Sequence, residues 1–200
     1  MIKNIIFDLG NVLMGFNPKP YFSEFLKDEA LSNRLIDLIT NDPSWNYYDQ
    51  GLLTLDEVKQ NYIKIFPKDE DSINLMLDHW MGVLKPIKPM IKLFYELKER
   101  GFNCFILSNL SKDAADHIKA NYSLIQDADG YVLSYEEKLV KPDPAIYQCL
   151  LSRYNLVAEE CLFLDDVLKN TTAALSLGIN TIHVASIDQA IEAIKEQLYD

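Results

Sequence analysis

A few polar side chains stand where apolar segments end, and their types suit phosphate and metal chemistry. They are Asp8, Ser108-Asn109, Lys141 and Asp165-Asp166. Clustered carboxylates bind hard cations, and two Asp side chains with a backbone carbonyl and water form an octahedral oxygen site suited to Mg²⁺. A phosphoryl group beside such an ion also needs donors, which the serine, the lysine and the amides of the Asp8 turn can supply. The set therefore predicts a site for Mg²⁺ and a phosphoryl group.

These side chains converge only if the segments before them are neighbouring parallel strands. Apolar, β-branched runs at residues 3–7, 102–107, 131–133, 161–164 and 181–184 predict strands. Amphipathic segments between them predict helices, among them one from Met90 to Arg100 that Gly101 closes. This alternation indicates an α/β fold, with a Rossmann-like parallel sheet core and helices on both faces. The carboxyl ends of parallel strands lie at one edge, where the polar set would meet.

A helical segment interrupts the alternation. The proline-rich stretches Asn17-Pro18-Lys19-Pro20 and Lys85-Pro86-Ile87-Lys88-Pro89 flank a region of helical periodicity with no convincing strand. Within it, Thr54-Leu55-Asp56-Glu57 has the spacing of a capping box and predicts a helix start. We therefore expect an α/β hydrolase core of residues 1–16 and 87–200, and an inserted all-helical cap of residues 17–86 that is hinged at two proline linkers.

Composition limits the partners and the compartment. The net charge of -11 argues against nucleic acid and anionic membrane as partners. The three cysteines are odd in number and lie in apolar contexts without metal-binding spacing, which indicates thiols in a reducing compartment. No signal-peptide pattern and no apolar run of membrane-spanning length is present. We expect a cytoplasmic protein, a monomer or weak homodimer.

The polar set also carries a resemblance. In order, FDLGNVL, LSN, the lysine of VKPDP, and FLDDVLKN resemble the four motifs of the haloacid dehalogenase-like hydrolase superfamily. The helical insertion between the first two motifs is similar to that superfamily's type-one cap, so the resemblance spans nearly the whole chain. FDLGNV, the WN…DQG stretch and DD-xxx-N are most similar to bacterial sugar-1-phosphate phosphatases and to the phosphatase domain of soluble epoxide hydrolases. Four motifs in this order are a specific signal, whereas one alone is weak.

The resemblance implies a Mg²⁺-dependent phosphatase that acts on a small phosphorylated metabolite such as a sugar phosphate. Asp8 would be the nucleophile that attacks phosphorus in line and forms an aspartyl-phosphate. The carbonyl of Gly10 and the carboxylate of Asp166 would join Asp8 around Mg²⁺. Asp165 would act mainly through a metal-bound water, and Asn170 would brace the metal loop.

The remaining positions would bind the substrate. The resemblance implies that Ser108 and the Asn109 amide hold phosphoryl oxygens. Lys141 would offset negative charge on both the phosphoryl group and the nucleophile. In the cap, the stretch from residue 45 to residue 51 is the expected specificity segment, with substrate contacts from Trp45, Tyr47 and Asp49.

The sequence departs from the family pattern at one position. The family usually has a second Asp two residues after the nucleophile, which protonates the leaving group and then activates water; here that position is Gly10. Metal binding survives, because this residue contributes its carbonyl, but acid/base catalysis worth about 10²–10⁴-fold does not. The departure suggests either a leaving group that departs easily, such as an anomeric sugar oxygen, or an acid supplied by the cap.

Two alternatives follow from this departure and from the family. One is a non-catalytic or very slow relative that binds a phosphate ligand. The other is a metal-independent haloacid dehalogenase, which would leave Asp165 and Asp166 without a role. A phosphate-accepting signalling receiver would be shorter and would lack the helical insertion.

Overall fold

The computed structural model describes residues 1–199, and Asp200 lies outside the described residues. Its centre is a parallel sheet with the strand order β5-β4-β1-β6-β7. The strands are β1 (Asn4–Phe7), β4 (Asn103–Ser108), β5 (Gly130–Leu133), β6 (Cys161–Asp165) and β7 (Asn180–His183). The predicted α/β class and Rossmann-like sheet are confirmed. Because β1 lies between β4 and β6, their carboxyl ends are adjacent.

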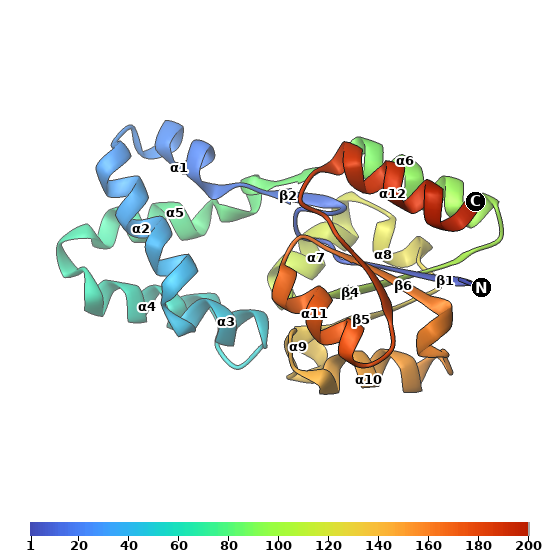
Figure 1. Cartoon of the computed structure of the whole chain (residues 1–200). Helices are drawn as coiled ribbons and strands as arrows, with labels where there is room; N and C mark the ends of the chain where they lie inside the picture. The colour runs from blue at the N-terminus through green and yellow to red at the C-terminus, as the bar shows by residue number, and fades with distance from the viewer. Residues whose placement is uncertain (200) are drawn as a thin grey trace.

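Side chains alternate across the sheet and form two apolar layers. Ile5 and Phe7 of β1 join one buried cluster, whereas Ile6 joins the other, as the twofold period of a strand requires. The first layer is covered by α6 (Lys88–Glu99), α7 (Lys112–Asn121), α8 (Leu124–Asp127) and α12 (Ile187–Tyr199). The second is covered mainly by α10 (Pro144–Arg153) and α11 (Leu168–Ser176) (Figure 1). With both faces covered, the strands are nearly continuous apolar runs.

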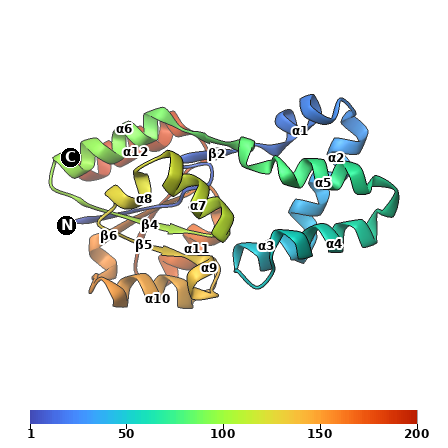
Figure 2. The same cartoon turned by 180° about the vertical axis from the view of Figure 1, so that it is seen from behind.

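A group of helices stands beside the sheet, on the side of its carboxyl edge (Figures 1 and 2). It contains α1 (Pro18–Leu26), α2 (Glu29–Asn41), α3 (Pro43–Asp49), α4 (Leu55–Ile65), α5 (Glu70–Asp78) and the short turns η1 (Pro67–Asp69) and η2 (Trp80–Val83). The predicted capping box starts α4, since the Glu57 amide donates to Thr54 Oγ1 and the Thr54 amide donates to Glu57 Oε2. The helices pack against one another through buried side chains, including Phe22, Tyr62 and Met76.

The connections between these helices and the sheet differ from the prediction of proline linkers. Pro18 and Pro20 lie in the first turn of α1, and Pro89 lies in the first turn of α6. Proline fits there because the first turn leaves its N–H groups unpaired and needs the φ that the ring fixes. The connection is instead an antiparallel ribbon of β2 (Met14–Phe16) and β3 (Leu84–Pro86). The two chain segments that lead to the helices are therefore bonded to each other.

Two expectations from composition concern the described residues. Cys104, Cys149 and Cys161 are free, and the first and last of them are buried. Between residues 1 and 199, no helix combines the length and the apolar character needed to cross a membrane.

Two short elements complete the path to the site. The helix α9 (Ser134–Glu137) directly follows β5, and the 3₁₀ turn η3 (Ala158–Glu160) directly precedes β6. The loop after α9 carries Lys141 toward the carboxyl edge of the sheet, where it contacts the residues that end β1 and β6.

Candidate active site

A buried lysine lies between two carboxylates at the carboxyl edge of the sheet. Lys141 Nζ is 2.9 Å from Asp8 Oδ1 and 2.6 Å from Asp165 Oδ2, and it donates to the carbonyl of Leu107 at 3.0 Å. The exposed fractions of the three charged side chains are 1%, 9% and 0%. A charge that is removed from water must be paired. The strand ends of β1 and β6 therefore require the lysine that the sequence places before Pro142.

The protonation of this cluster suits a carboxylate nucleophile. Burial raises the pKa of Asp8 to about 6; the Lys141 ammonium acts against this, and the nearby charge of Asp165 adds to it. Burial by itself would lower the pKa of Lys141, but Asp8 and Asp165 outweigh it and hold that pKa above its ordinary value. At neutral pH the lysine is therefore charged and Asp8 is mostly ionised.

Asn109 positions the lysine. Its side-chain Nδ2 donates to the carbonyl of Lys141 at 3.0 Å, and the amide of Lys141 donates to Asn109 Oδ1 at 2.7 Å. The Asn109 side chain thus holds the lysine's main chain on both sides. Ser108, which is 1% exposed, ends β4 beside Asp8, and its hydroxyl acts to lower the pKa of that carboxyl.

The carboxylates of Asp8, Asp165 and Asp166 fit a divalent cation. Each offers an oxygen, and these oxygens lie within 4.8 Å of one another. Asp165 already accepts from Lys141, from the Val167 amide at 2.8 Å and from Asn170 Nδ2 at 3.1 Å. Asp166 is half-buried, and among the described side chains only Asn11 donates to its carboxylate. Oxygen donors of this kind suit Mg²⁺, and Asp8 and Asp166 have the freer oxygens.

Asn11 has a role that sequence reasoning missed. It has a φ of 51°, a left-handed conformation that asparagine tolerates better than most residues. Its Nδ2 donates to Asp166 Oδ2 at 2.9 Å, and its Oδ1 accepts from the Phe16 amide at 2.8 Å. Asn11 directly follows Gly10 in the turn after β1, and a Gly-Asn pair is typical of a turn. Its hydrogen-bond partners, by contrast, are known only from the folded chain.

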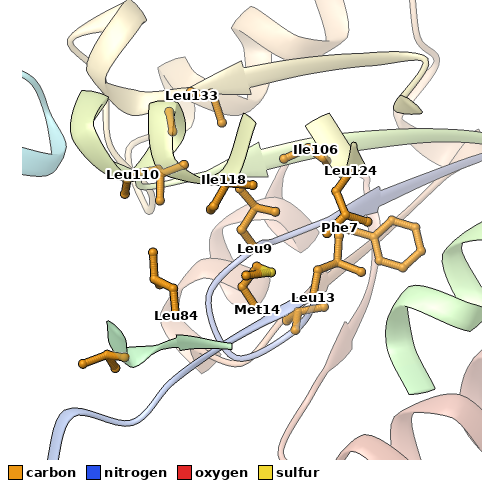
Figure 3. Packing of buried hydrophobic residues seen from close by; sticks show 14 of the residues in the cluster. Phe7, Leu9, Leu13, Met14, Leu84, Ile106, Leu110, Ile118, Leu124 and Leu133 are labelled. Atoms are coloured by element: carbon orange, nitrogen blue, oxygen red, sulfur yellow. The ribbon is translucent and has the colours of Figure 1, made fainter. Parts of the chain in front are cut away.

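A cavity of about 180 Å³ opens between the carboxyl edge and the helices. Gly10, Asn109 and Asp166 line it from the sheet, and Trp45 and Asp49 line it from α3. Much of the remaining wall is apolar and includes Leu9, Met14, Leu84, Leu110 and Ile118, which Figure 3 labels among the buried hydrophobic residues. The polar groups are therefore concentrated at the sheet end of the cavity, together with one carboxyl from α3.

Only part of the predicted specificity segment reaches this cavity. Trp45 and Asp49 line it, whereas Tyr47 is 47% exposed and is not among the lining residues. Trp80 is 3% exposed and also lines the cavity, edge-to-face with Trp45 at a centroid distance of 5.1 Å. The sequence alone does not indicate which aromatic residues of the helices face a cavity.

Nearly the whole chain is similar in sequence to known phosphatases. The chain is 26% identical over 182 residues to a sesquiterpene phosphatase from Aspergillus oryzae, with 91% of this chain and 89% of that protein aligned. It is 25% identical over 189 residues to a D-ribitol-5-phosphate phosphatase from Bacteroides thetaiotaomicron, covering 90% of this chain and 91% of that protein. A solved structure of a haloacid dehalogenase-family enzyme from the same organism, in complex with magnesium and inorganic phosphate, matches with a TM-score of 0.73 at 24% identity, over 91% of this chain and 93% of that one.

The family model provides the strongest comparison. The model described as haloacid dehalogenase-like hydrolase matches residues 2–178. This range contains all of the strand-end residues that form the buried lysine and carboxylate cluster. The chain therefore belongs to the haloacid dehalogenase-like hydrolase family.

Proposed function

We propose that this phosphoric monoester hydrolase releases phosphate from a small phosphorylated metabolite in a Mg²⁺-dependent reaction, through an aspartyl-phosphate on Asp8. One observation carries the proposal: a buried carboxylate at a strand end, 2.9 Å from a buried lysine ammonium. Burial removes the water that would solvate the carboxylate, and the lysine keeps it ionised. An ionised, weakly solvated carboxylate is a nucleophile for phosphorus.

The proposed reaction has two displacements. An oxygen of Asp8 forms a bond to phosphorus, and the bond from phosphorus to the ester oxygen breaks, so that the alcohol leaves with a proton. Water then attacks the same phosphorus, the bond to Asp8 breaks, and phosphate is released. Lys141 holds the orientation of Asp8 through both steps. Bound by Asp8, Asp166 and the Gly10 carbonyl, Mg²⁺ would supply positive charge that offsets the phosphoryl oxygens.

Two kinds of organic group are candidates for the substrate. A sugar phosphate is supported by the motif resemblance and by the similarity to a D-ribitol-5-phosphate phosphatase. The cavity wall supports a second candidate, since Trp45, Trp80 and Leu84 offer few partners for sugar hydroxyls. A phosphate ester with a hydrocarbon face would bury apolar surface there, and the similarity to a sesquiterpene phosphatase agrees with this.

Phosphate release from matched substrates tests the function and separates the candidates. Wild-type protein and Asp8→Asn are assayed with MgCl₂ and with EDTA, on ribitol 5-phosphate, glucose 1-phosphate and a prenyl monophosphate. We expect release that requires both Mg²⁺ and Asp8. A higher kcat/KM for the prenyl ester favours a substrate with a hydrocarbon face, and a higher kcat/KM for ribitol 5-phosphate or glucose 1-phosphate favours a sugar phosphate. Activity that persists in EDTA or in Asp8→Asn contradicts the proposal, and release of halide from a 2-haloacid supports the dehalogenase alternative.

A further inference from the structure

The structure leaves room for an acid at position 10 but provides none there. A Cβ built on Gly10 would have Asp8 Oδ2, at 3.9 Å, as its nearest contact, so a side chain would fit without a clash. The family's usual carboxyl is therefore absent although the site has space for it. If alcohol leaves from this site, a proton must come from another group that reaches the same cavity.

Asp49 is in the right place. It ends α3, is partly buried, and lines the same cavity as Gly10 and Asp166. Within the described chain, it is the one ionisable side chain that the helices contribute to this lining. Its neighbours in the wall include Trp45 and Trp80, which have no carboxyl or amine to offer. A proton donor from the helical side of the cavity is therefore Asp49.

The segment that carries Asp49 is fixed to the core. Hydrogen bonds from both sides join residues 48–51 to α7, to α9 and to the residue after α9. The pairs are Tyr48 Oη to Asp113 Oδ2 at 2.7 Å, Ser134 Oγ to the Asp49 carbonyl, Gln50 Nε2 to the Lys138 carbonyl, and Lys138 Nζ to the Gly51 carbonyl. Gly51 has a φ of 67°, and a Cβ there would lie 2.8 Å from the backbone carbonyl oxygen of Tyr135, so this close approach depends on glycine. The carboxyl of Asp49 is thus held relative to the carboxyl edge of the sheet.

The surroundings of Asp49 keep a proton available near neutral pH. Burial raises its pKa to about 7; a backbone hydrogen bond from Ser111 acts against this, and the negative charge of Asp8 adds to it. A general acid works best when its pKa lies near the working pH, because enough of it is protonated and it still gives up the proton readily. The negative charge of Asp8 thus makes the Asp49 proton harder to remove.

We propose that Asp49 is the general acid of the reaction and replaces the carboxyl that Gly10 lacks. The proposal rests on the phosphatase function proposed above. As the bond between phosphorus and the ester oxygen breaks, its electron pair stays on that oxygen, which takes the proton from Asp49 and leaves as the alcohol. The resulting Asp49 carboxylate then accepts a proton from the water that attacks the aspartyl-phosphate, and the protonated acid is restored.

Two esters of similar size distinguish an acid from a binding residue. The leaving group of benzyl phosphate is an alkoxide, which departs poorly unless it is protonated. The leaving group of 4-nitrophenyl phosphate is a stable phenolate, which departs without a proton. For Asp49→Asn, which keeps the shape of the side chain, the readout is kcat/KM, because it reports phosphoryl transfer to Asp8 and not the later hydrolysis that both esters share. We expect kcat/KM on benzyl phosphate to fall by about 10²–10⁴-fold and kcat/KM on the nitrophenyl ester to fall by less than about tenfold. Asp37→Asn makes the same change at an exposed carboxyl of α2 that does not line the cavity; it is the control and should change neither.

A second substitution makes the test independent of that variant. Gly10→Asp restores the family's carboxyl, so in the Asp49→Asn background it should recover benzyl phosphate hydrolysis. In the otherwise unchanged chain it should alter the benzyl-to-nitrophenyl ratio of kcat/KM by less than about tenfold, because an acid is already present. A larger rise in this ratio would mean that no acid was in place, and it would overturn the proposal even if Asp49→Asn does not fold.

The remaining outcomes are also decisive. Equal losses of kcat/KM on both esters in a folded Asp49→Asn, or no loss on either, would overturn the role of Asp49 and leave the phosphatase function standing. If the wild-type protein released phosphate from neither ester and from no other monoester tested with Mg²⁺, the proposed function itself would fail, and the acid with it.

Discussion

Replacing Lys141 by methionine would remove the only cation that contacts Asp8 and Asp165 among the described residues. Methionine keeps most of the apolar volume of the lysine side chain, so the change removes the charge with little loss of packing. It leaves two carboxylates facing each other in a region where their exposed side-chain fractions are 9% and 0%. We expect a large loss of stability.

The magnitude follows from the burial of the cluster. Removing one partner of a buried ion pair costs about 3–5 kcal/mol, because the other charge stays buried without compensation. With a urea slope of about 2 kcal/mol per M, the unfolding midpoint should fall by about 1.5–2.5 M. Lys169→Met is the matched control: this lysine is exposed in α11, and its loss should change the unfolding free energy by less than about 0.5 kcal/mol.

The pH dependence of this loss has a definite sign. The folded-state pKa of Asp8 is raised from 3.8 to about 6 even with the lysine present, and removing the lysine raises it further. A carboxyl with a raised folded pKa is most favourable to folding below its unfolded value and becomes unfavourable as pH rises through the folded value. The deficit of Lys141→Met relative to wild type should therefore be smallest near pH 4 and should grow through pH 6 and above.

Urea unfolding in EDTA, followed by far-ultraviolet circular dichroism, measures the loss. Circular dichroism is preferable to fluorescence, because both tryptophans, Trp45 and Trp80, belong to the helices beside the sheet. A Lys141→Met midpoint that matches Lys169→Met at neutral pH would refute the reasoning, and so would a deficit that shrinks as pH rises.

The other predictions concern the metal, the cavity and the acid. Asp166→Ala should weaken Mg²⁺ binding in calorimetric titration more than Asp165→Ala, for which we expect about 10–100-fold; the reverse order would mean that the two roles are exchanged. Trp45→Ala should raise KM for a prenyl phosphate by about tenfold or more while Tyr47→Ala leaves it unchanged, and steady-state kinetics would contradict this if the two variants behaved alike. The kcat/KM for benzyl phosphate should fall as pH rises through about 7, where the Asp49 carboxyl loses its proton, and a pH profile with the same descending limb in Asp49→Asn would exclude this residue as its source.

The sequence predicted the sheet well because its strands are strong local patterns that end in polar groups. Asp8 and Asp165 could be expected to meet, since parallel strands place their carboxyl ends along one edge. The ribbon of β2 and β3 was not predicted, because three-residue strands are too short to show a period. In addition, the two strands pair across a long separation in the sequence, with all the cap helices between them. From the sequence, the first-turn prolines were assigned to linkers, because proline is equally compatible with an extended linker and with the first turn of a helix.

The details of the candidate site depended on distant contacts that no local pattern records. The hydrogen bond from Asn11 to Asp166 joins residues 155 positions apart. Likewise, the exposure of Tyr47 and the raised pKa of Asp49 follow from how α3 lies against the core, not from its own sequence. The residue types of the site were therefore predictable, whereas their individual surroundings were not.

The two hydrogen bonds of Asn11 link Asp166, in the loop after β6, to the ribbon of β2 and β3. One end of this short side chain holds Asp166, and the other holds Phe16 in the strand that leads to the helices. A shift of the ribbon would therefore move a carboxylate that we propose as a ligand of Mg²⁺, and Mg²⁺ bound at Asp166 would act on the ribbon through the same side chain. Such coupling is reciprocal: whatever factor Mg²⁺ adds to the affinity for a ligand held under the helices, that ligand adds to the affinity for Mg²⁺.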